Sequence, residues 1–243
     1  MEKDWFKDWF ASEEYNSVYN HRDEDDAKKL IDLILSHITL NNNSLLLDAA
    51  CGRGRHLNYL ASLKLNVIGF DLSMQFLFQV KQKSLKVNPA IFRADIREVC
   101  FKKKFDLVLN LFTSFGYFET DEENFRFVKK TFSFLNDNGY YVLDYLNKSY
   151  LTQNLIPYSK RLIGDIVLEE FREIKNDRVI KKILIERGGK KKIFHESVKL
   201  YSKDFLLEQF ISFGYSYFKL FGDYEGHPYD EIKSERLIMI FQK

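Results

Sequence analysis

One stretch of the sequence predicts a strand, a glycine turn and a helix in direct succession: Leu45-Leu46-Leu47-Asp48-Ala49-Ala50-Cys51-Gly52-Arg53-Gly54-Arg55-His56. Its apolar start is typical of a buried strand. After the two glycines, apolar residues recur with helical spacing at Leu57, Leu60, Ala61 and Leu63. This order of elements opens a nucleotide-binding α/β unit. Glycine suits the turn because it accepts positive φ and leaves room for a ligand to approach the backbone.

A second predicted strand ends in an acidic residue. Residues 67–70 are apolar, and Asp71 follows 23 residues after Asp48. An acid here can accept hydrogen bonds from both hydroxyls of a ribose. The glycine turn alone is a weak signal, because Leu57 stands where the fingerprint G-x-G-x-x-G has its third glycine. An ordinary βαβ turn that binds nothing is the structural alternative.

Two further predicted strands extend the series. Residues 91–96 carry Asp95 at the end of a third strand, and residues 105–110 form a fourth that ends in Asn110. The succession D-x-x-C-G-x-G, G-F-D-L-S, A-D-I and F-D-L-V-L-N resembles class I S-adenosylmethionine (SAM)-dependent methyltransferases over residues 15 to 145, and the resemblance returns at the C-terminus. It implies an α/β fold: a Rossmann-like three-layer sandwich whose mostly parallel seven-stranded sheet has an antiparallel last strand. It also implies SAM as the cofactor.

The resemblance implies roles for individual residues in cofactor binding. Leu72 would flank the adenine, the Asp95 carboxylate would accept a hydrogen bond from the adenine amino group, and the Ile96 backbone would donate to the ring. Arg22 could pair with the methionine carboxylate of the cofactor, because a guanidinium fork matches a carboxylate. A turn cap for Asp95 and a surface ion pair for Arg22 are the alternatives. The predicted set is Tyr19, Arg22, Asp48, Ala50, Cys51, Gly52, Gly54, Asp71, Leu72, Asp95, Ile96, Asn110 and Leu111.

The run after the fourth strand is expected to border the methyl acceptor, because ligands of open parallel sheets bind beyond the carboxyl ends of the strands. It lacks the N-P-P-Y or D-P-P-Y type motif of family members that methylate amino groups of DNA or protein. Its T-S-F-G-Y, residues 113–117, resembles small-molecule methyltransferases, as does the segment at residues 222–236. A packed loop is the alternative. The predicted acceptor-pocket residues are Phe112, Ser114, Phe115, Tyr117, Tyr145 and Tyr224.

Methyl transfer from a sulfonium makes few demands on protein groups. Holding the acceptor in line can supply ~7–11 kcal/mol, and a proton acceptor is optional. The sequence therefore assigns no catalytic residue. Weak candidates for a proton acceptor are Tyr15, His195, His227 and Asp144. The two cysteines, Cys51 and Cys100, have no metal-binding spacing, so no metal is expected.

Three segments organise the chain. Residues 1–150 are expected to form the SAM-binding core with an aromatic N-terminal helical lid, which either simply packs on the core or covers the cofactor and acceptor. Residues 151–201 lack intervening helices and predict an inserted antiparallel sheet of three strands (161–174, 178–187 and 191–201) joined by hairpin turns. We expect this insertion to act as a substrate cover or as a dimer interface. Residues 202–243 complete the core sheet.

Composition limits the class of partner. The chain has 243 residues, 45% of them hydrophobic, and a net charge of +2, which argues against a nucleic-acid grip over the whole chain. No apolar run approaches the ~20 residues of a membrane span, and two cysteines suit a reduced, cytoplasmic protein. We expect a small-molecule acceptor, methylated on nitrogen or oxygen, and a monomer or homodimer. The rivals are an RNA or protein methyltransferase, with Lys102–Lys104 and Lys190–Lys192 as its basic surface, and a non-catalytic module that keeps the fold.

Overall fold

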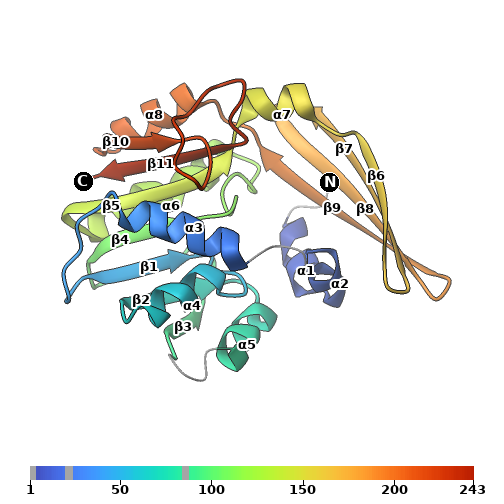
Figure 1. Ribbon diagram of the computed structural model, residues 1–243, viewed down its shortest axis with the longest axis horizontal. Coiled ribbons are helices and arrows are strands. Elements are labelled where there is room, and N and C mark those ends of the chain that lie inside the picture. The colour runs from blue at the N-terminus through green and yellow to red at the C-terminus, as the bar shows by residue number, and fades with distance from the viewer. Residues whose placement is uncertain (1–3, 20–23, 84–87) are drawn as a thin grey trace.

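The structure, a computed structural model, describes residues 4–19, 24–83 and 88–243 and is built on two sheets (Figure 1). The larger sheet has seven strands in the order β10-β11-β5-β4-β1-β2-β3. All neighbours are parallel except β11, which runs antiparallel to both β5 and β10. The predicted fold class is therefore confirmed. The strands are β1 (Leu45–Ala49), β2 (Asn66–Asp71), β3 (Ala90–Arg93), β4 (Phe105–Asn110), β5 (Leu135–Leu146), β10 (Ser216–Phe221) and β11 (Arg236–Gln242).

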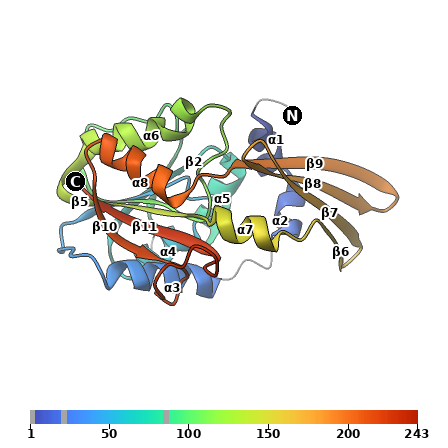
Figure 2. The ribbon, with the colours of Figure 1, turned by 90° about the horizontal axis from the view of Figure 1, so that it is seen from above.

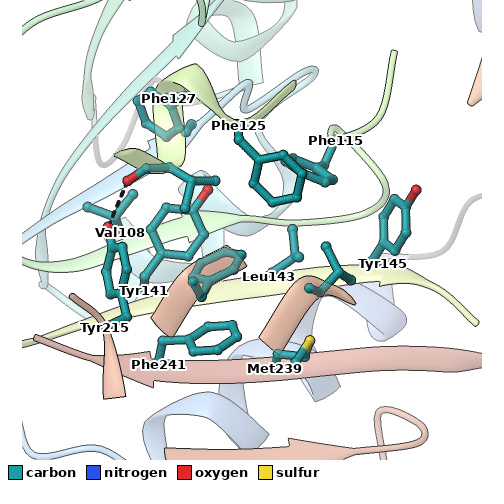
Figure 3. Close-up of a cluster of buried hydrophobic side chains, with 14 of the residues drawn as sticks. Val108, Phe115, Phe125, Phe127, Tyr141, Leu143, Tyr145, Tyr215, Met239 and Phe241 are labelled. Carbon is teal, nitrogen blue, oxygen red and sulfur yellow. Dashed lines mark hydrogen bonds between the residues drawn. The ribbon is translucent and has the colours of Figure 1, made fainter. Parts of the chain in front are cut away.

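Helices cover both faces of this sheet, because its central strands are apolar on both sides. Along β5, Tyr141 and Leu143 join the cluster under α6 and α8, whereas Tyr140 and Val142 join the cluster under α3, α4 and α5. This alternation follows from the two-residue repeat of a strand. Figure 3 shows the first cluster, where Tyr215 donates a hydrogen bond to the carbonyl of Val128. The covering helices are α3 (Glu24–Leu35), α4 (Arg55–Ser62), α5 (Met74–Lys83), α6 (Asp121–Phe134) and α8 (Lys203–Ser212).

The insertion forms the second sheet, which is entirely antiparallel in the order β6-β7-β8-β9. It follows helix α7 (Lys148–Asn154) and extends away from the core (Figure 2). Our expectation of three strands was wrong, since the first predicted strand is a hairpin that turns at Gly164-Asp165 with Gly164 at φ +59°. The strands are β6 (Tyr158–Ile163), β7 (Ile166–Lys175), β8 (Arg178–Arg187) and β9 (Lys190–Lys199).

The aromatic N-terminus folds as two short helices, α1 (Trp5–Ala11) and α2 (Glu13–Val18), which lie beneath the insertion (Figure 1). Trp9 is almost fully buried and packs on Phe194 of β9, with 4.4 Å between the ring centroids. The same cluster includes Ile183 of the insertion and Phe76 of α5. These helices therefore join the insertion to the core. Among the described helices, none has the length and apolar character to cross a membrane.

Candidate functional site

The carboxyl ends of β1, β2 and β4 meet at one edge of the large sheet, and a cavity of about 100 Å³ opens there. We call it the cofactor cavity. Six of the predicted cofactor residues line it: Asp48, Ala50, Cys51, Gly52, Asp71 and Leu111. Its wall also includes Phe10, Tyr15, Arg53, Arg55, His56, Phe76, Phe112, Ser114 and Tyr117.

The glycine turn after β1 is built from left-handed backbone. Ala50, Gly52 and Gly54 have φ of 55°, 55° and 74°. A Cβ on Gly52 would meet nothing within 4 Å, so this backbone borders open space, whereas a Cβ on Gly54 would lie 2.7 Å from Val80. Gly52 thus keeps the cavity open and Gly54 lets α4 pack on α5. Of the two glycines only Gly52 lines this cavity, and the contact of either with a ligand stays a prediction.

Asp71 supports this turn from the end of β2. Its Oδ2 accepts the Gly52 N–H and its Oδ1 accepts the Ser73 N–H, each at 2.8 Å. Burial raises the pKa of Asp71 to about 6, although these backbone N–H groups favour the charged form. Each carboxylate oxygen has a second lone pair. The residue lies in the cavity wall, and its contact with a ribose stays a prediction.

Asp48 presents an unsatisfied polar atom at the cavity. Its Oδ2 is buried and has no hydrogen-bond partner among the described residues. The pKa of Asp48 is raised to about 8, mainly by burial and secondly by repulsion from Asp71. The Leu57 backbone N–H favours the charged form of the carboxylate, but a buried oxygen without a donor is still costly. A cationic ligand that donates a hydrogen bond would relieve that cost. SAM carries an ammonium group that donates hydrogen bonds and a sulfonium that adds a second positive charge, and the residues present therefore fit it.

A second cavity, of about 400 Å³, lies on the other side of Phe10. Leu72 and Asp95, the predicted adenine contacts, line it. The Asp95 carboxylate accepts hydrogen bonds from the Arg97 backbone N–H at 2.9 Å and from its guanidinium Nη2 at 2.7 Å. The turn-capping alternative therefore describes the contacts that Asp95 makes here, and its role toward adenine remains a prediction.

The loop that follows β4 separates the cofactor cavity from a third one, and its backbone is strained. Phe112 and Thr113 both have positive φ, of 55° and 62°. The Phe112 N–H donates to Asp144 Oδ2 at 2.9 Å, and Arg236 pairs with Asp144 Oδ1 at 2.7 Å. Ser114 donates to Asn110 Oδ1 at 2.6 Å. Asp144 and Asn110 thus hold this loop in place.

The third cavity, of about 310 Å³, lies between this loop, the N-terminal helices and the insertion. We call it the acceptor cavity. Three charged residues form one row across its floor, because they are paired across β7, β8 and β9: Arg172, Lys181 and Glu196. We call them the polar row. The cofactor and acceptor cavities share Phe10, Tyr15, Phe112 and Tyr117. The other lining residues are Trp5, Tyr19, Thr113, Leu146, Leu151, Leu155, Val179, Val198 and Arg236.

The polar row is held by a network of side chains. Glu196 Oε1 accepts hydrogen bonds from Trp9 Nε1 at 2.7 Å and from the Tyr19 hydroxyl at 2.5 Å. Lys181 donates to the Tyr19 hydroxyl at 2.6 Å and pairs with Glu170 at 3.0 Å. The carboxylate on the cavity floor is therefore fixed by residues from α1, the insertion and the segment after α2.

Several predicted site residues lie elsewhere. Phe115 and Tyr145 are buried in the core cluster shown in Figure 3. Tyr224 donates to Asp144 Oδ2 at 3.1 Å and lies behind the loop. Exposed His195 neighbours Glu196 and therefore points to the opposite face of the sheet. His227 is exposed and bonds to Asp223 Oδ2 at 2.7 Å.

The remaining predictions concern backbone positions and one residue that the structure leaves out. Gly54 lies in the turn, and Asn110 and Ile96 are near the ends of β4 and β3 without lining these cavities. Tyr15 lines both the cofactor and the acceptor cavity. Arg22 lies outside the described residues.

Sequence reasoning missed the contributions of distant elements. Arg172 and Lys181 of the insertion carried no motif, and strand alternation alone could not say which face meets the core. His56 of α4 lines the cofactor cavity, and burial lowers its pKa to about 3, so its imidazole is neutral. Arg55 lies over the ring of Phe112 at 4.4 Å. The helical position of residues 55 and 56 beside the glycine turn was the available signal.

Residues 46–139 match the family model described as a methyltransferase domain. A dTDP-3-amino-3,4,6-trideoxy-alpha-D-glucopyranose N,N-dimethyltransferase from Streptomyces venezuelae is 30% identical over 112 residues, which cover 45% of this chain and 46% of the relative. A putative methyltransferase of Bacillus subtilis is 29% identical over 60% of this chain and 57% of its own length. The chain thus spans about half the length of the curated relatives it matches.

Solved structures share the fold along almost the whole chain. A SAM-dependent methyltransferase from Clostridium acetobutylicum has a TM-score of 0.81 at 20% identity, covering 94% of this chain and 97% of that one. A SAM-bound amino pentose methyltransferase from Micromonospora echinaspora has a TM-score of 0.69 at 18% identity, covering 95% and 97%. At these identities the likeness extends to the fold alone.

Proposed function

We propose that this chain, which belongs to the class I SAM-dependent methyltransferases, methylates an amino nitrogen of a small polar acceptor, with amino sugars as the first class to test. The observation that carries the proposal is the junction of the two cavities. Phe10, Tyr15, Phe112 and Tyr117 line both of them. An acceptor on the polar row could therefore reach into the cofactor cavity. The amino-sugar N,N-dimethyltransferase of Streptomyces venezuelae among the relatives supports nitrogen as the target.

The residues around the junction suit methyl transfer. When bound, SAM supplies a methyl group that is electrophilic because it is attached to a sulfonium. Aromatic side chains at the junction exclude water, and an aromatic ring near a cation adds ~0.5–2 kcal/mol of attraction. The polar row offers charged hydrogen-bond partners to acceptor hydroxyl or amino groups. Orientation of the acceptor is then the main contribution of the protein.

Among the four candidates for a proton acceptor, we propose Tyr15. Its side chain is buried and lines both cavities. The Asp144 carboxylate already accepts hydrogen bonds from the Phe112 N–H, the Tyr224 hydroxyl and Arg236 Nε. His195 and His227 are exposed. We also propose that residues 151–201 act as the cover of the acceptor, since the polar row belongs to them.

The test is a methyl-transfer assay with radiolabelled SAM and matched acceptors. We expect transfer to dTDP-3-amino-3,4,6-trideoxyglucose or to a simple amino sugar, and none to the analogue with hydroxyl in place of the amino group. Mass spectrometry would locate the methyl group on nitrogen. Transfer only to the hydroxyl analogue, to RNA or to protein would contradict the proposal. SAM binding without transfer to any acceptor would favour a non-catalytic module.

A further inference from the structure

A single arginine joins the insertion to the loop between the two cavities. Arg178 is the first residue of β8, and its side chain is half-buried. Its Nη1 donates to the Phe118 carbonyl at 3.0 Å, and its Nη2 donates to the carbonyls of Gly116 and Tyr117, each at 3.2 Å. On the other side, its Nε donates to Ser197 Oγ at 2.6 Å. The guanidinium therefore spans three consecutive loop carbonyls and β9.

From these contacts we propose that Arg178 is a positioning residue for methyl transfer, which fixes residues 116–118 and so holds Tyr117 at the junction of the cofactor and acceptor cavities. The proposal rests on the proposed function for its catalytic consequence. Its structural part, that Arg178 holds the loop, stands on the hydrogen bonds alone.

The loop needs support at both of its ends. Its first half is held by Asp144 and Arg236, as described above. In its second half, Gly116 has φ +91° and no room for a side chain, since a Cβ would lie 3.0 Å from the Tyr145 hydroxyl. The Gly116 carbonyl accepts the Lys199 N–H at 2.7 Å as well as Arg178. The same loop carbonyl is thus held by a backbone N–H of β9 and by the Arg178 side chain.

Tyr117 makes the position of this segment consequential. Its ring lies against Trp5 and Phe10 of α1, with centroid distances of 5.5 and 5.8 Å. It also lines both the cofactor and the acceptor cavity. A shift of its backbone would therefore change the shape of the junction between the two cavities, where the acceptor nitrogen has to meet the methyl group.

Only an arginine can make the whole set of contacts. A guanidinium has five N–H donors in a planar fork, whereas an ammonium has three donors around one atom and an amide has two. Lysine would keep the charge but lose the simultaneous contact with three carbonyls and Ser197. Glutamine would lose both the charge and these simultaneous contacts.

The experiment compares Arg178→Gln and Arg178→Lys with Arg187→Gln, a control at the other end of β8 whose exposed side chain pairs only with Asp165 in the described structure. Hydrogen exchange would follow the amides of residues 112–118 and Lys199. Calorimetry would give the SAM affinity, and the acceptor identified in the transfer assay would give kcat and KM. We expect faster exchange and a kcat reduced roughly a hundredfold in R178Q, as a misplacement near 1 Å can cause.

Specific outcomes separate positioning from general stability. SAM affinity and KM near those of the wild type, with partial recovery of kcat in R178K, would support positioning. Wild-type kcat in R178Q, or an equal loss of SAM affinity and kcat, would overturn it. If R178Q does not fold, R178K decides by the same criteria. If the wild type methylates no acceptor, the proposed function fails, and unchanged exchange at residues 116–118 would separately overturn the loop contact.

Discussion

At the scale of single residues, Asp48 carries an unusual electrostatic cost. Its carboxylate lies at the end of a buried strand, one of its oxygens has no partner among the described residues, and its pKa is raised to about 8 by burial and by Asp71. A cost of this kind is commonly stored at a binding site, because the ligand relieves it. At neutral pH the free protein therefore holds Asp48 mostly protonated, and a cationic ligand would draw out its ionised form.

Replacing Asp48 by Asn should stabilise the free protein and weaken SAM binding. Between pH 3.8, the ordinary pKa of an Asp, and about pH 8, Asp48 stays protonated in the folded protein but is ionised in the unfolded chain. Wild-type stability should consequently fall as pH rises through this window, and D48N should lack that slope. At pH 8 we expect D48N to gain at least about 1 kcal/mol, or roughly 2–4 °C in Tm.

The same charge should make SAM binding depend on pH. Because the ligand prefers ionised Asp48, the Kd of the wild type should tighten by up to about tenfold between pH 6 and 7. D48N should bind roughly 10–100-fold more weakly at pH 7, the value of a hydrogen bond to a charged group. Calorimetry at several pH values measures both. A wild-type Kd independent of pH would contradict the role given to Asp48.

Gly52 permits a matched test of the turn. Gly52 and Gly164 have φ of 55° and 59°, and a Cβ at either would meet nothing within 4 Å. Ala at either site should cost a similar ~1 kcal/mol of backbone strain. Only Gly52→Ala adds a methyl group to the cofactor cavity, so it should lose SAM affinity by at least about tenfold while Gly164→Ala retains it. Equal SAM affinity in the two variants would remove Gly52 from the binding site.

At the scale of elements, helix α1 stands between the two parts of the cofactor region. Phe10 lines both the cofactor cavity and the cavity with Leu72 and Asp95, and the Phe10 carbonyl accepts a hydrogen bond from Ser73 Oγ at 3.0 Å. At about 100 Å³, the first cavity is small for a ligand that extends from the glycine turn to Leu72. We therefore expect α1 to shift when SAM binds.

Intrinsic fluorescence reports on this shift directly, because both tryptophans of the chain, Trp5 and Trp9, belong to α1. Their emission should change on addition of SAM with the Kd found by calorimetry. Phe10→Ala should bind SAM more tightly, by a few-fold, since the ring no longer has to move. Unchanged emission at saturating SAM, together with wild-type affinity of F10A, would mean that α1 does not respond.

Sequence patterns predicted elements well where their signals were local. The parallel core was predicted from the Leu45–Leu47 run, the glycines and the acids at strand ends. The first of these glycines and the acids of β1 and β2 also lie at the sheet edge where the cofactor cavity opens. The turn at Gly164-Asp165 was missed although Gly-Asp is a hairpin signal, because the apolar pattern around it continues without a break. Tertiary placement was less accessible. Nothing local showed that Glu196 would face Trp9, or that Arg178 would reach the loop after β4.

At the scale of the whole molecule, three segments meet around the acceptor cavity. The N-terminal helices contribute Trp5, Phe10 and Tyr15. The insertion contributes Glu196 and Lys181, and the core contributes Phe112. The cavity thus exists only when all three are packed together. We infer that the insertion determines which acceptor is used, while the core determines the cofactor.

Glu196→Gln tests this division of labour. It keeps the shape of the side chain but removes the charge that an acceptor would meet on the cavity floor. The acceptor KM should rise roughly tenfold or more, in line with the loss of a charged hydrogen bond, while the Kd for SAM stays unchanged. The control is His195→Gln, the exposed neighbour on the other face. Equal kinetics in E196Q and H195Q would show that the polar row does not contact the acceptor.

We infer that the edge of the large sheet binds SAM for methyl transfer. Calorimetric titration of the protein with SAM and with its demethylated product, S-adenosylhomocysteine, tests it most directly. We expect one site per chain, micromolar affinity for both compounds, and loss of that affinity in Gly52→Ala but not in Gly164→Ala. Absence of binding to either compound by the folded wild-type protein would contradict it.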